Sequence, residues 1–436
     1  MARTITPIDA HLIMNELVRE ATGIDSVAST DISSFVSAGE TVLATGMENV
    51  VNALNIVLNR TLVAARPYSA KFKLVQALDT GIYSNRIRKI SYFAQYALPD
   101  GSHNTDLFTN LAAGFTAGEN PTGLGVAQST KSQWEQHPAM PLEMNFAGSS
   151  VWQDCITLYD DQIQVAFRGP EEFARFVSGF MTEHGNDIES QKEAWNRMAV
   201  LNKIASCYYY DANSDSTGQV INLTSAFNTR FGTNYNSSQL RSTYLKEFLA
   251  FFVAEFKKVS KFMTERSAIR HINFTNTIDG VDYAILRHTP YSKQRVYLYS
   301  PLFTDAEALV LPEIFRPNYL DLDTQYEDVT YWQGQSSRAE INVTPAVYDT
   351  ATGEQIPAAA AINLEYVVGA IMDEDALMTN FQLERADTTA LEARKHYRNT
   401  WNTFMRNIID DPSENCVIFI MDDSDVEPEP EPEPGT

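Results

Sequence analysis

The chain has 436 residues, of which 44% are hydrophobic and 11% aromatic, so it can form a large core and is not disordered throughout. It holds 33 lysines and arginines against 56 aspartates and glutamates, a formal charge of −23, which disfavours binding of nucleic acid or anionic lipid through net charge. The length corresponds to about three domains at roughly 150 residues each. No apolar run approaches the roughly 20 residues of a membrane span, and no signal peptide is recognisable. We therefore expect a soluble, cytosolic protein.

The first 65 residues are typical of a helical arm. Thr6 and Pro7 have the residue types of a helix cap and first turn, and Gly23 marks an end, so a helix is predicted between them. A second helix is predicted over 47–62, because apolar residues recur there at helical spacing.

Residues 66–150 are predicted to form an extended loop. Polar and apolar residues alternate in 71–74 and again from residue 86 onward, with a turn signal at 79–81 between them, which predicts one long two-stranded ribbon or a pair of hairpins. Residues 100–150 hold six of the 20 glycines, and we expect a long irregular loop there.

The next stretch predicts a long helical strut. Its start is marked by Gly169-Pro170-Glu171-Glu172, since a first-turn proline and acids near a helix N-terminus are both favourable. About forty residues, ending at Tyr210, are mainly helical in pattern. Gly179 and Gly185 leave open whether they form one helix or two.

The remaining chain mixes helices with strands. Within 211–340 the sequence predicts an amphipathic helix over 238–265, a strand over 295–299 and a helix capped by Thr304. Strands are predicted afterwards at 341–348, 366–372, 376–380 and 417–421. The last fifteen residues, 422–436, hold seven acids, no base and a Glu-Pro repeat, which predicts a disordered, extended and solvated tail.

No motif for catalysis or cofactor binding is complete. The chain has no phosphate-binding P-loop, no nucleophile elbow and no cysteines or histidines at metal-ligand spacing. Asp321-Leu322-Asp323-Thr324 has the form of an aspartate-nucleophile phosphatase motif, but the apolar strand that this chemistry requires does not precede it. We expect no enzyme, cofactor or metal site. A cytosolic Mg²⁺-dependent hydrolase using Asp321 and Asp323 is the alternative.

The order of the predicted elements resembles the major capsid proteins of tailed bacteriophages, whose Hong Kong-type (Johnson) fold is shared with encapsulins. Residues 68–74 with the strand after Arg86 are similar to the extended loop of that family, which leans over a neighbouring subunit. Residues 170–210 resemble its spine helix, 295–304 its axial domain and 365–378 its closing peripheral strands. The nearest varieties are the capsids of short-tailed Salas-like or crAss-like phages.

The resemblance implies an α+β capsid fold in six parts: an N-terminal arm (1–65), an extended loop (66–150), a peripheral domain with the spine helix (151–210), an axial domain (211–340), returning peripheral strands (341–421) and the acidic tail (422–436). It implies self-assembly through pentamers and hexamers into an icosahedral virion shell in the host bacterial cytoplasm. The shell would enclose double-stranded DNA without sequence-specific binding. Scaffolding, portal and decoration proteins are the implied partners, and an encapsulin-like nanocompartment is an alternative with the same fold.

The ribbon is the expected contact surface between subunits. A two-stranded ribbon is marginal in water by itself, so we expect residues 68–98 to find no packing partner in their own chain and to become ordered on a neighbouring copy. Arg86, Arg88 and Lys89 form a basic patch, hypothesised to pair with acids of that copy; a solvated strand face is the alternative. The predicted interface residues are Phe72, Leu74, Arg86, Ile87, Arg88, Lys89, Ile90 and Phe93.

Overall fold

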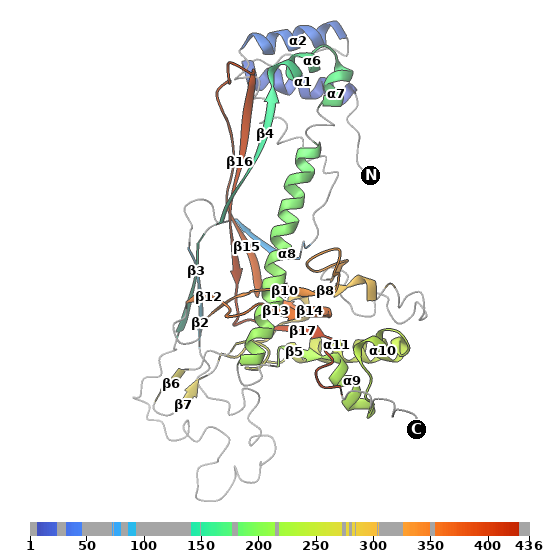
Figure 1. The fold of residues 1–436 in the computed structure, drawn as a ribbon. Coiled ribbons are helices and arrows are strands. Elements are labelled where there is room, and N and C mark those ends of the chain that lie inside the picture. The colour runs from blue at the N-terminus through green and yellow to red at the C-terminus, as the bar shows by residue number, and fades with distance from the viewer. Residues whose placement is uncertain are drawn as a thin grey trace, which may run out of the picture.

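The chain is elongated, with a helical cluster at one end, a mixed body at the other and one long helix joining them (Figure 1). The computed structural model describes residues 7–23, 32–45, 72, 74–79, 86–92, 141–148, 150–176, 182–213, 218–272, 276–278, 281–283, 285–302, 304, 326–348 and 354–426. Helices and strands both contribute throughout, which confirms the predicted mixture of helix and strand. None of the helices within these ranges is long and apolar enough to cross a membrane.

The helical cluster combines α1 (Pro7–Thr22) and α2 (Ile32–Ala44) with α6 (Asp160–Ala166) and α7 (Pro170–Phe176). Its small core includes Leu17, Phe35 and Phe173, all buried. The predicted first helix is confirmed: it starts at Pro7 and ends before Gly23, whose positive φ of 70° suits a residue without a side chain. The helix predicted over 47–62 lies outside the described residues.

The predicted strut is the 32-residue helix α8 (Thr182–Asn213), about 48 Å long at 1.5 Å per residue. Gly185 lies inside it, whereas the described part of α7 ends at Phe176, so the predicted start at Pro170 belongs to a separate element. The C-terminal half of α8 is buried in the body, where Val200 and Ile204 are fully covered. α8 thus connects the helical cluster to the main core (Figure 1).

A four-stranded sheet runs alongside α8 in the order β1-β15-β16-β4. Its strands are β1 (Gln76–Asp79), β15 (Leu377–Thr388), β16 (Tyr397–Asp410) and β4 (Ser150–Tyr159). The strand predicted over 71–74 is wrong, because the pairing with β15 begins only at Gln76. The strand predicted over 376–380 is confirmed but extends to Thr388, and the 14-residue β16 was not predicted.

The body is built on a five-stranded sheet in the order β5-β17-β14-β8-β9. The strands are β5 (Val220–Asn222), β17 (Cys416–Ile420), β14 (Val367–Asp373), β8 (Gln294–Tyr299) and β9 (Tyr326–Val329). Every residue of β14 and β17 is buried, as expected for a sheet covered on both faces. The strands predicted over 295–299, 366–372 and 417–421 are therefore confirmed.

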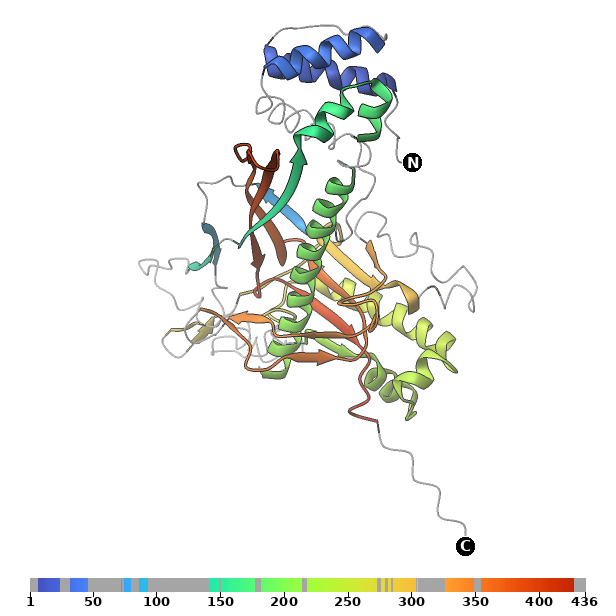
Figure 2. The same ribbon diagram turned by 45° about the horizontal axis from the view of Figure 1, so that its top comes forward.

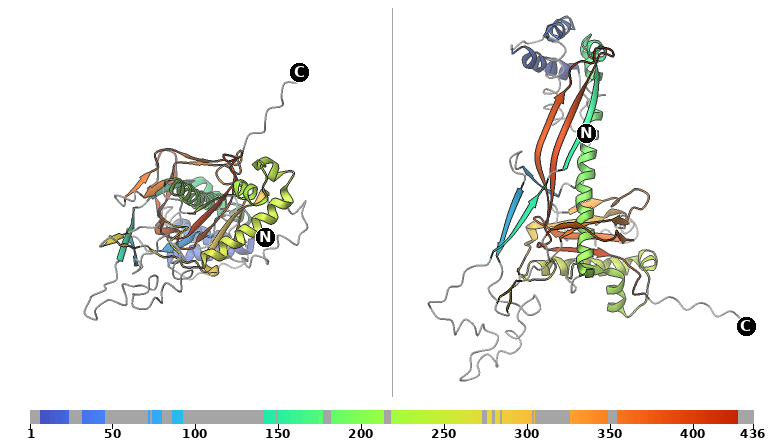
Figure 3. Two further views of the ribbon diagram at one scale, coloured as in Figure 1. Left: turned by 90° about the horizontal axis from the view of Figure 1, so that it is seen from below. Right: turned by 60° about the vertical axis from the view of Figure 1, so that its left-hand side comes forward.

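The sheet lies between α8 on one face and a three-helix unit on the other (Figures 2 and 3). This unit consists of α9 (Leu223–Phe231), α10 (Ser237–Arg241) and α11 (Leu245–Met263). The predicted helix over 238–265 is divided in two, since a capping box at Asn236 starts the short α10 and the chain turns before α11. The predicted apolar face of α11 is confirmed: Phe252 and Phe256 contact Phe419 with ring centroids 5.6 and 5.7 Å away.

Short elements complete the described body. They are the strand pairs β10 (Ile341–Val343) with β13 (Ile362–Leu364), β11 (Ala346–Tyr348) with β12 (Gln355–Pro357), and β6 (Asn276–Ile278) with β7 (Val281–Tyr283), together with the 3₁₀ turn Tyr291–Lys293. The strand predicted over 341–348 is thus two short strands. The predicted cap at Thr304 is wrong, because Ser300, Pro301 and Leu302 are already helical and Thr304 Oγ1 donates to the Ser300 carbonyl (3.1 Å) from within that helix. The rest of the predicted helix and most of the Glu-Pro tail lie outside the described residues, and the six-part division stays a prediction.

Candidate functional site

The candidate surface is a two-stranded ribbon that stands apart from the long strands (Figures 1 and 3). It pairs β2 (Arg86–Tyr92) with β3 (Pro141–Ala147) in antiparallel register, Arg86 opposite Ala147 and Tyr92 opposite Pro141. The strand predicted from Arg86 onward is confirmed, but its predicted pairing with residues 71–74 is wrong, because β2 pairs with β3 instead. β3 comes from the end of the segment predicted to be irregular, where Leu142, Met144 and Phe146 alternate with polar residues in step with β2.

The two faces of the ribbon differ in exposure. On the inner face Ile87 and Lys89 are half-buried and Ser91 is buried, and Phe146 of β3 packs edge-on against Tyr348 with ring centroids 6.4 Å apart. On the outer face Ile90 is 48% exposed and Tyr92 61% exposed. The ribbon is therefore attached to its own body by one face and presents two large apolar side chains on the other.

The outer face also carries a small charged group. Glu143 of β3 accepts hydrogen bonds from Arg88 Nη2 (2.6 Å), Arg86 Nη2 (3.3 Å) and Asn145 Nδ2 (3.0 Å). The Asn145 amide, and then the Arg88 guanidinium, lower the pKa of Glu143. Both arginines thus have an acid within their own chain, and their pairing with another copy stays a prediction.

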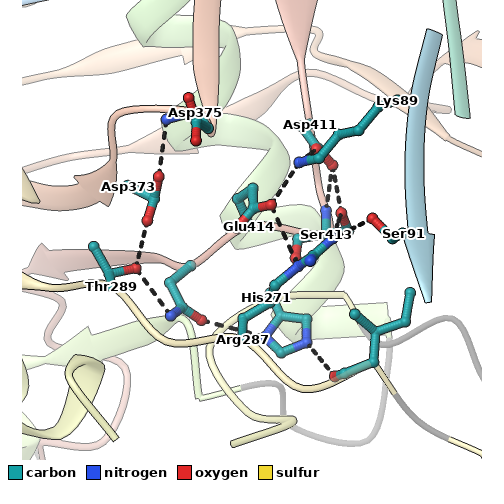
Figure 4. Close-up of polar contacts among 12 residues, drawn as sticks. Lys89, Ser91, His271, Arg287, Thr289, Asp373, Asp375, Asp411, Ser413 and Glu414 are labelled. Carbon is teal, nitrogen blue, oxygen red and sulfur yellow. Dashed lines mark hydrogen bonds and ion pairs between the residues drawn. The ribbon is translucent and has the colours of Figure 1, made fainter. Parts of the chain in front are cut away.

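Lys89 anchors the ribbon at its inner face, where its Nζ forms ion pairs with Asp411 and Glu414 in the loop between β16 and β17 (Figure 4). Next to it, Arg287 donates from Nη2 to Ser91 Oγ (2.7 Å) and from Nε to the Ser413 carbonyl (3.0 Å). The ribbon is therefore fastened at two successive inward positions. Both acids beside Lys89 belong to its own chain, and its pairing with a neighbouring subunit, like that of the two arginines, stays a prediction.

The anchoring loop, residues 410–415, is polar and yet buried along its whole length. Asp411 accepts from Ser413 N (2.8 Å) and Oγ (2.7 Å). Although burial acts in the opposite direction, Lys89 and Ser413 hold the pKa of Asp411 below its ordinary value. Burial raises the pKa of Glu414 despite the cations Lys89 and Arg287 beside it.

A second set of polar contacts extends from the same loop through Asn415 (Figure 4). Asn415 donates from Nδ2 to Thr289 Oγ1 (3.1 Å), which donates to Asp373 Oδ2 (2.7 Å). His271 lies 3.2 Å from Asn415 Oδ1 through Nδ1 and 3.0 Å from the Ile285 carbonyl through Nε2. Burial lowers the pKa of His271 to about 4. These contacts suit a structural network that holds the loop in one conformation.

Two predicted interface residues belong to the core instead. Phe72 is 1% exposed and stacks on Tyr297 with ring centroids 5.9 Å apart, while the Arg197 guanidinium lies 4.7 Å from its ring. Leu74 is partly buried against the same core and donates its N–H to Glu327 (3.2 Å). The expectation that residues 68–98 have no packing partner in their own chain is therefore wrong for this part. The core sheet presents an aromatic ring to Phe72 that the sequence does not reveal. Phe93 lies outside the described residues.

The enzymatic alternative finds no support at the positions on which it depends. Asp321 and Asp323 lie outside the described residues. Across the ranges given above, no three histidines, cysteines, aspartates or glutamates are grouped so that they could hold a metal ion. Cys155 is exposed, whereas Cys207 and Cys416 are buried, and all three are free thiols.

The anchoring loop was not predicted as part of the site. Its sequence, Asp410-Asp411-Pro412-Ser413-Glu414-Asn415, has the residue types of a surface turn. A signal was nevertheless present, because the loop leads directly into the apolar strand β17 and so lies near the core. Its ion-pair partner Lys89 is more than three hundred residues away in sequence, and no local pattern predicts that contact.

Comparisons with known proteins give similarity in structure only. No family model matches the sequence, and no curated protein is significantly similar to it. The capsid structure of Staphylococcus phage Andhra is 12% identical with a TM-score of 0.48, over 81% of this chain and 85% of that one. The structure of the head fiber and inner core protein gp22 of native bacteriophage P68 is 9% identical with a TM-score of 0.44, over 81% of this chain and 85% of that one. The capsid structure of the Cyanophage P-SCSP1u is 9% identical with a TM-score of 0.41, over 82% of this chain and 90% of that one. Likeness at this level does not assign a function.

Proposed function

We propose that this chain is the repeating subunit of a capsid: a major capsid protein that self-assembles into the icosahedral shell around the double-stranded DNA genome of a tailed phage. The observation that carries the proposal is the ribbon β2–β3. Its inner face is fastened to its own body through Lys89 and Ser91, while its outer face exposes Ile90 and Tyr92 to solvent. The order of elements in the sequence supports the same function.

An anchored ribbon with an apolar outer face suits contact with a second copy. Apolar side chains of this size are buried more often than they are exposed, and covering Ile90 and Tyr92 would remove apolar area from water. In the proposed shell the contact is head-to-tail: Ile90 and Tyr92 of one copy pack on a different surface of the next, and such contacts form a ring when their rotation closes. Pentamers and hexamers are the rings that the proposed shell requires.

The attachment of the ribbon lowers the entropic cost of this contact. A ribbon held at its base loses less conformational freedom on binding than a free one does. Each contact can then be weak, because many repeated contacts hold a shell together by multivalency. Scaffolding, portal and decoration proteins are further partners within the proposal, and the shell would enclose DNA without reading its sequence.

The test is assembly of the full-length protein, followed by size-exclusion chromatography and negative-stain imaging. Wild-type protein, expressed alone or with a scaffold, should give large closed particles. Ile90→Asp with Tyr92→Asp should leave folded subunits that elute as small species, because two charges cannot be desolvated at the contact. The matched control, Ile90→Val with Tyr92→Phe, keeps the face apolar and should still give particles. Normal shells from the aspartate variant would exclude the ribbon as the assembly contact.

A second readout separates a virus shell from a cargo-holding compartment. Particles isolated from an infected host should contain double-stranded DNA. A wild-type protein that stays a small oligomer under every assembly condition would argue against a shell of either kind.

A further inference from the structure

We propose that Cys207 and Cys416 are a redox pair: on oxidation their thiols join in one disulfide that links α8 to β17 within the same chain. Cys207 lies near the C-terminal end of α8, and Cys416 is the first residue of β17. Both are free thiols, 1% and 0% exposed. The inference is independent of the proposed function, since it concerns a bond within one subunit.

The alternation of β17 directs Cys416 toward α8. Successive side chains of a strand point to opposite faces of the sheet. Phe419 contacts Phe252 and Phe256, so its side chain lies on the face that α11 covers. Cys416, three residues earlier, therefore lies on the opposite face, which α8 covers (Figure 2).

Two further contacts place Cys207 over the same part of β17. Gln219 donates from Nε2 to Cys207 Sγ (3.7 Å), and its carbonyl accepts from Ile418 N (2.8 Å), two residues after Cys416. The Cys416 thiol is itself a side-chain hydrogen-bond partner of Cys207. The two sulfur atoms are therefore neighbours between the helix and the sheet. Contact between thiols is the precondition of a disulfide, whose sulfurs lie about 2.05 Å apart.

The surroundings of the pair keep its thiols protonated. Burial, followed by the hydrogen bond with Cys416, raises the pKa of Cys207 well above its ordinary value. The charge of Lys203, one helical turn away, acts in the opposite direction. Because the thiolate is the reacting form of a cysteine, the pair should stay reduced on brief exposure to an oxidant and should react slowly on longer exposure.

Hydrogen peroxide is the oxidant that we assign to this step, because a buried pair is reached most easily by a small molecule. One thiolate attacks a peroxide oxygen, the O–O bond breaks, and the released hydroxide takes up the thiol proton as water. The resulting sulfenic acid condenses with the second thiol: the S–S bond forms, the S–O bond breaks, and the hydroxyl leaves with the thiol proton as a second water. The two thiols lose two electrons in total, and one peroxide is reduced to two waters.

Contact between the two sulfurs favours this product over deeper oxidation. A sulfenic acid beside a second thiol condenses to a disulfide, whereas one without a neighbouring thiol is open to oxidation to sulfinic acid. The bond closes a loop of more than two hundred residues in the unfolded chain, and in the chain-entropy account long loops give the largest stabilisation. The oxidised protein should therefore resist unfolding better than the reduced protein.

The first experiment treats the full-length protein carrying Cys155→Ser with hydrogen peroxide, unfolds it and labels the remaining thiols with a maleimide. The reduced protein should take up a label at both cysteines. After oxidation it should take up none, its mass should be lower by two hydrogens, and a non-reduced digest should contain Cys207 and Cys416 in one linked peptide pair. Dithiothreitol should restore both labels, because a disulfide is reversible and a sulfinic acid is not.

The matched controls are Cys207→Ala and Cys416→Ala in the same background, each of which keeps one buried thiol and cannot form the bond within a chain. The exposed Cys155 of the wild-type protein reports the effective dose of peroxide. Buried thiols that stay reduced long after Cys155 is fully oxidised would overturn the proposal. Sulfinic acid at Cys207 or Cys416 without the linked peptides, or links between ¹⁴N- and ¹⁵N-labelled chains, would overturn it as well.

A second measurement compares the urea midpoints of the oxidised and reduced Cys155→Ser protein. The oxidised protein should unfold at a higher urea concentration, and dithiothreitol should abolish the shift. The Cys416→Ala control should show no such shift after peroxide treatment. Equal midpoints for the two forms would overturn the proposal, because a bond between α8 and β17 in their folded positions restricts the unfolded chain.

Discussion

Lys203 Nζ lies 2.8 Å from Asp410 Oδ1, and the two side chains are only 1% and 6% exposed. The same amine donates to the Asp411 carbonyl at 2.7 Å, and Asn202 donates to the second oxygen of Asp410 at 2.9 Å. This buried pair joins α8 to the end of β16. Although burial acts in the opposite direction, Asp410 raises the pKa of Lys203, which favours the charged ammonium of Lys203 in the folded protein.

Removing one partner of this pair should be strongly destabilising. Lys203→Met leaves the Asp410 carboxylate buried without its cation, and we expect a loss of about 3–5 kcal/mol in the free energy of unfolding. Urea denaturation would measure it. As a control, Arg385→Ala breaks the exposed pair with Asp387 (2.6 Å, both side chains more than half exposed) and should cost under about 0.5 kcal/mol. Equal losses for the two variants would contradict the importance of burial here.

The stability of the protein should fall in mild acid because of His271. Its folded pKa of about 4 lies below its ordinary value of 6.5, so the unfolded chain binds the extra proton. The stabilisation is complete above about pH 6.5 and decreases as the pH falls toward 4, by about 3 kcal/mol in total.

A comparison of variants isolates this contribution. His271→Gln should reduce the decrease between pH 6.5 and 4 in urea titrations to the part due to His184, whose pKa is also lowered by burial, whereas His288→Gln, at an exposed position, should keep the full decrease. The raised pKa of Glu414 acts in the opposite sense in this range, and the lowered pKa of Asp411 acts only below its ordinary value of 3.8. An unchanged slope in the His271 variant would disprove the assignment.

Loss of the Lys89 anchor should release the ribbon without unfolding the body. Lys89→Met removes the cation from Asp411 and Glu414, and we expect local opening of β2–β3 to become easier by about 2 kcal/mol, since the lysine side chain is about a quarter exposed. Hydrogen exchange at the β2 amides would detect this as faster exchange confined to the ribbon. Arg88→Met, on the exposed face, is the matched control. Comparable acceleration in both would show that the anchor has no special role.

Gly369 should not tolerate a side chain. A Cβ atom there would lie 2.5 Å from Leu298 Cδ2 and 2.7 Å from the Tyr297 carbonyl oxygen, and the second atom belongs to the backbone of the adjacent strand. We expect Gly369→Ala to cost about 2–3 kcal/mol by overpacking. Gly169→Ala, where nothing lies within 4 Å of the added atom, should have little effect in the same thermal or chemical denaturation.

The sequence predicted those helices and strands that show a clear hydrophobic pattern within their own residues. The buried strand around Val367 and the apolar face of α11 follow from local pattern, since continuous apolar runs and helical spacing are properties of the segment itself. β16 escaped prediction because its alternation places polar residues on the inner face, among them Asn402 and Arg406, which are buried. A pattern of hydrophobicity cannot show that a buried position is polar.

In the candidate site, too, local pattern predicted one strand, whereas contacts between distant segments were not predictable. The strand at Arg86 was predictable, but its partner β3 lies some fifty residues further along the chain, and such pairings depend on tertiary context. The exposure of Ile90 and the burial of Phe72 differ although both occur in alternating sequence. Phe72 is covered by Tyr297 and Arg197, which come from distant parts of the sequence, so the alternation alone does not distinguish the two positions.

Asp411 has a mechanical consequence through its two cationic neighbours. Its side chain receives Lys89 from the ribbon, and its carbonyl receives Lys203 from α8. A force on the ribbon would therefore be transmitted through one residue to α8, the longest helix in the part of the chain that the structure describes. A displacement of the ribbon and a tilt of α8 are thereby mechanically coupled within one chain.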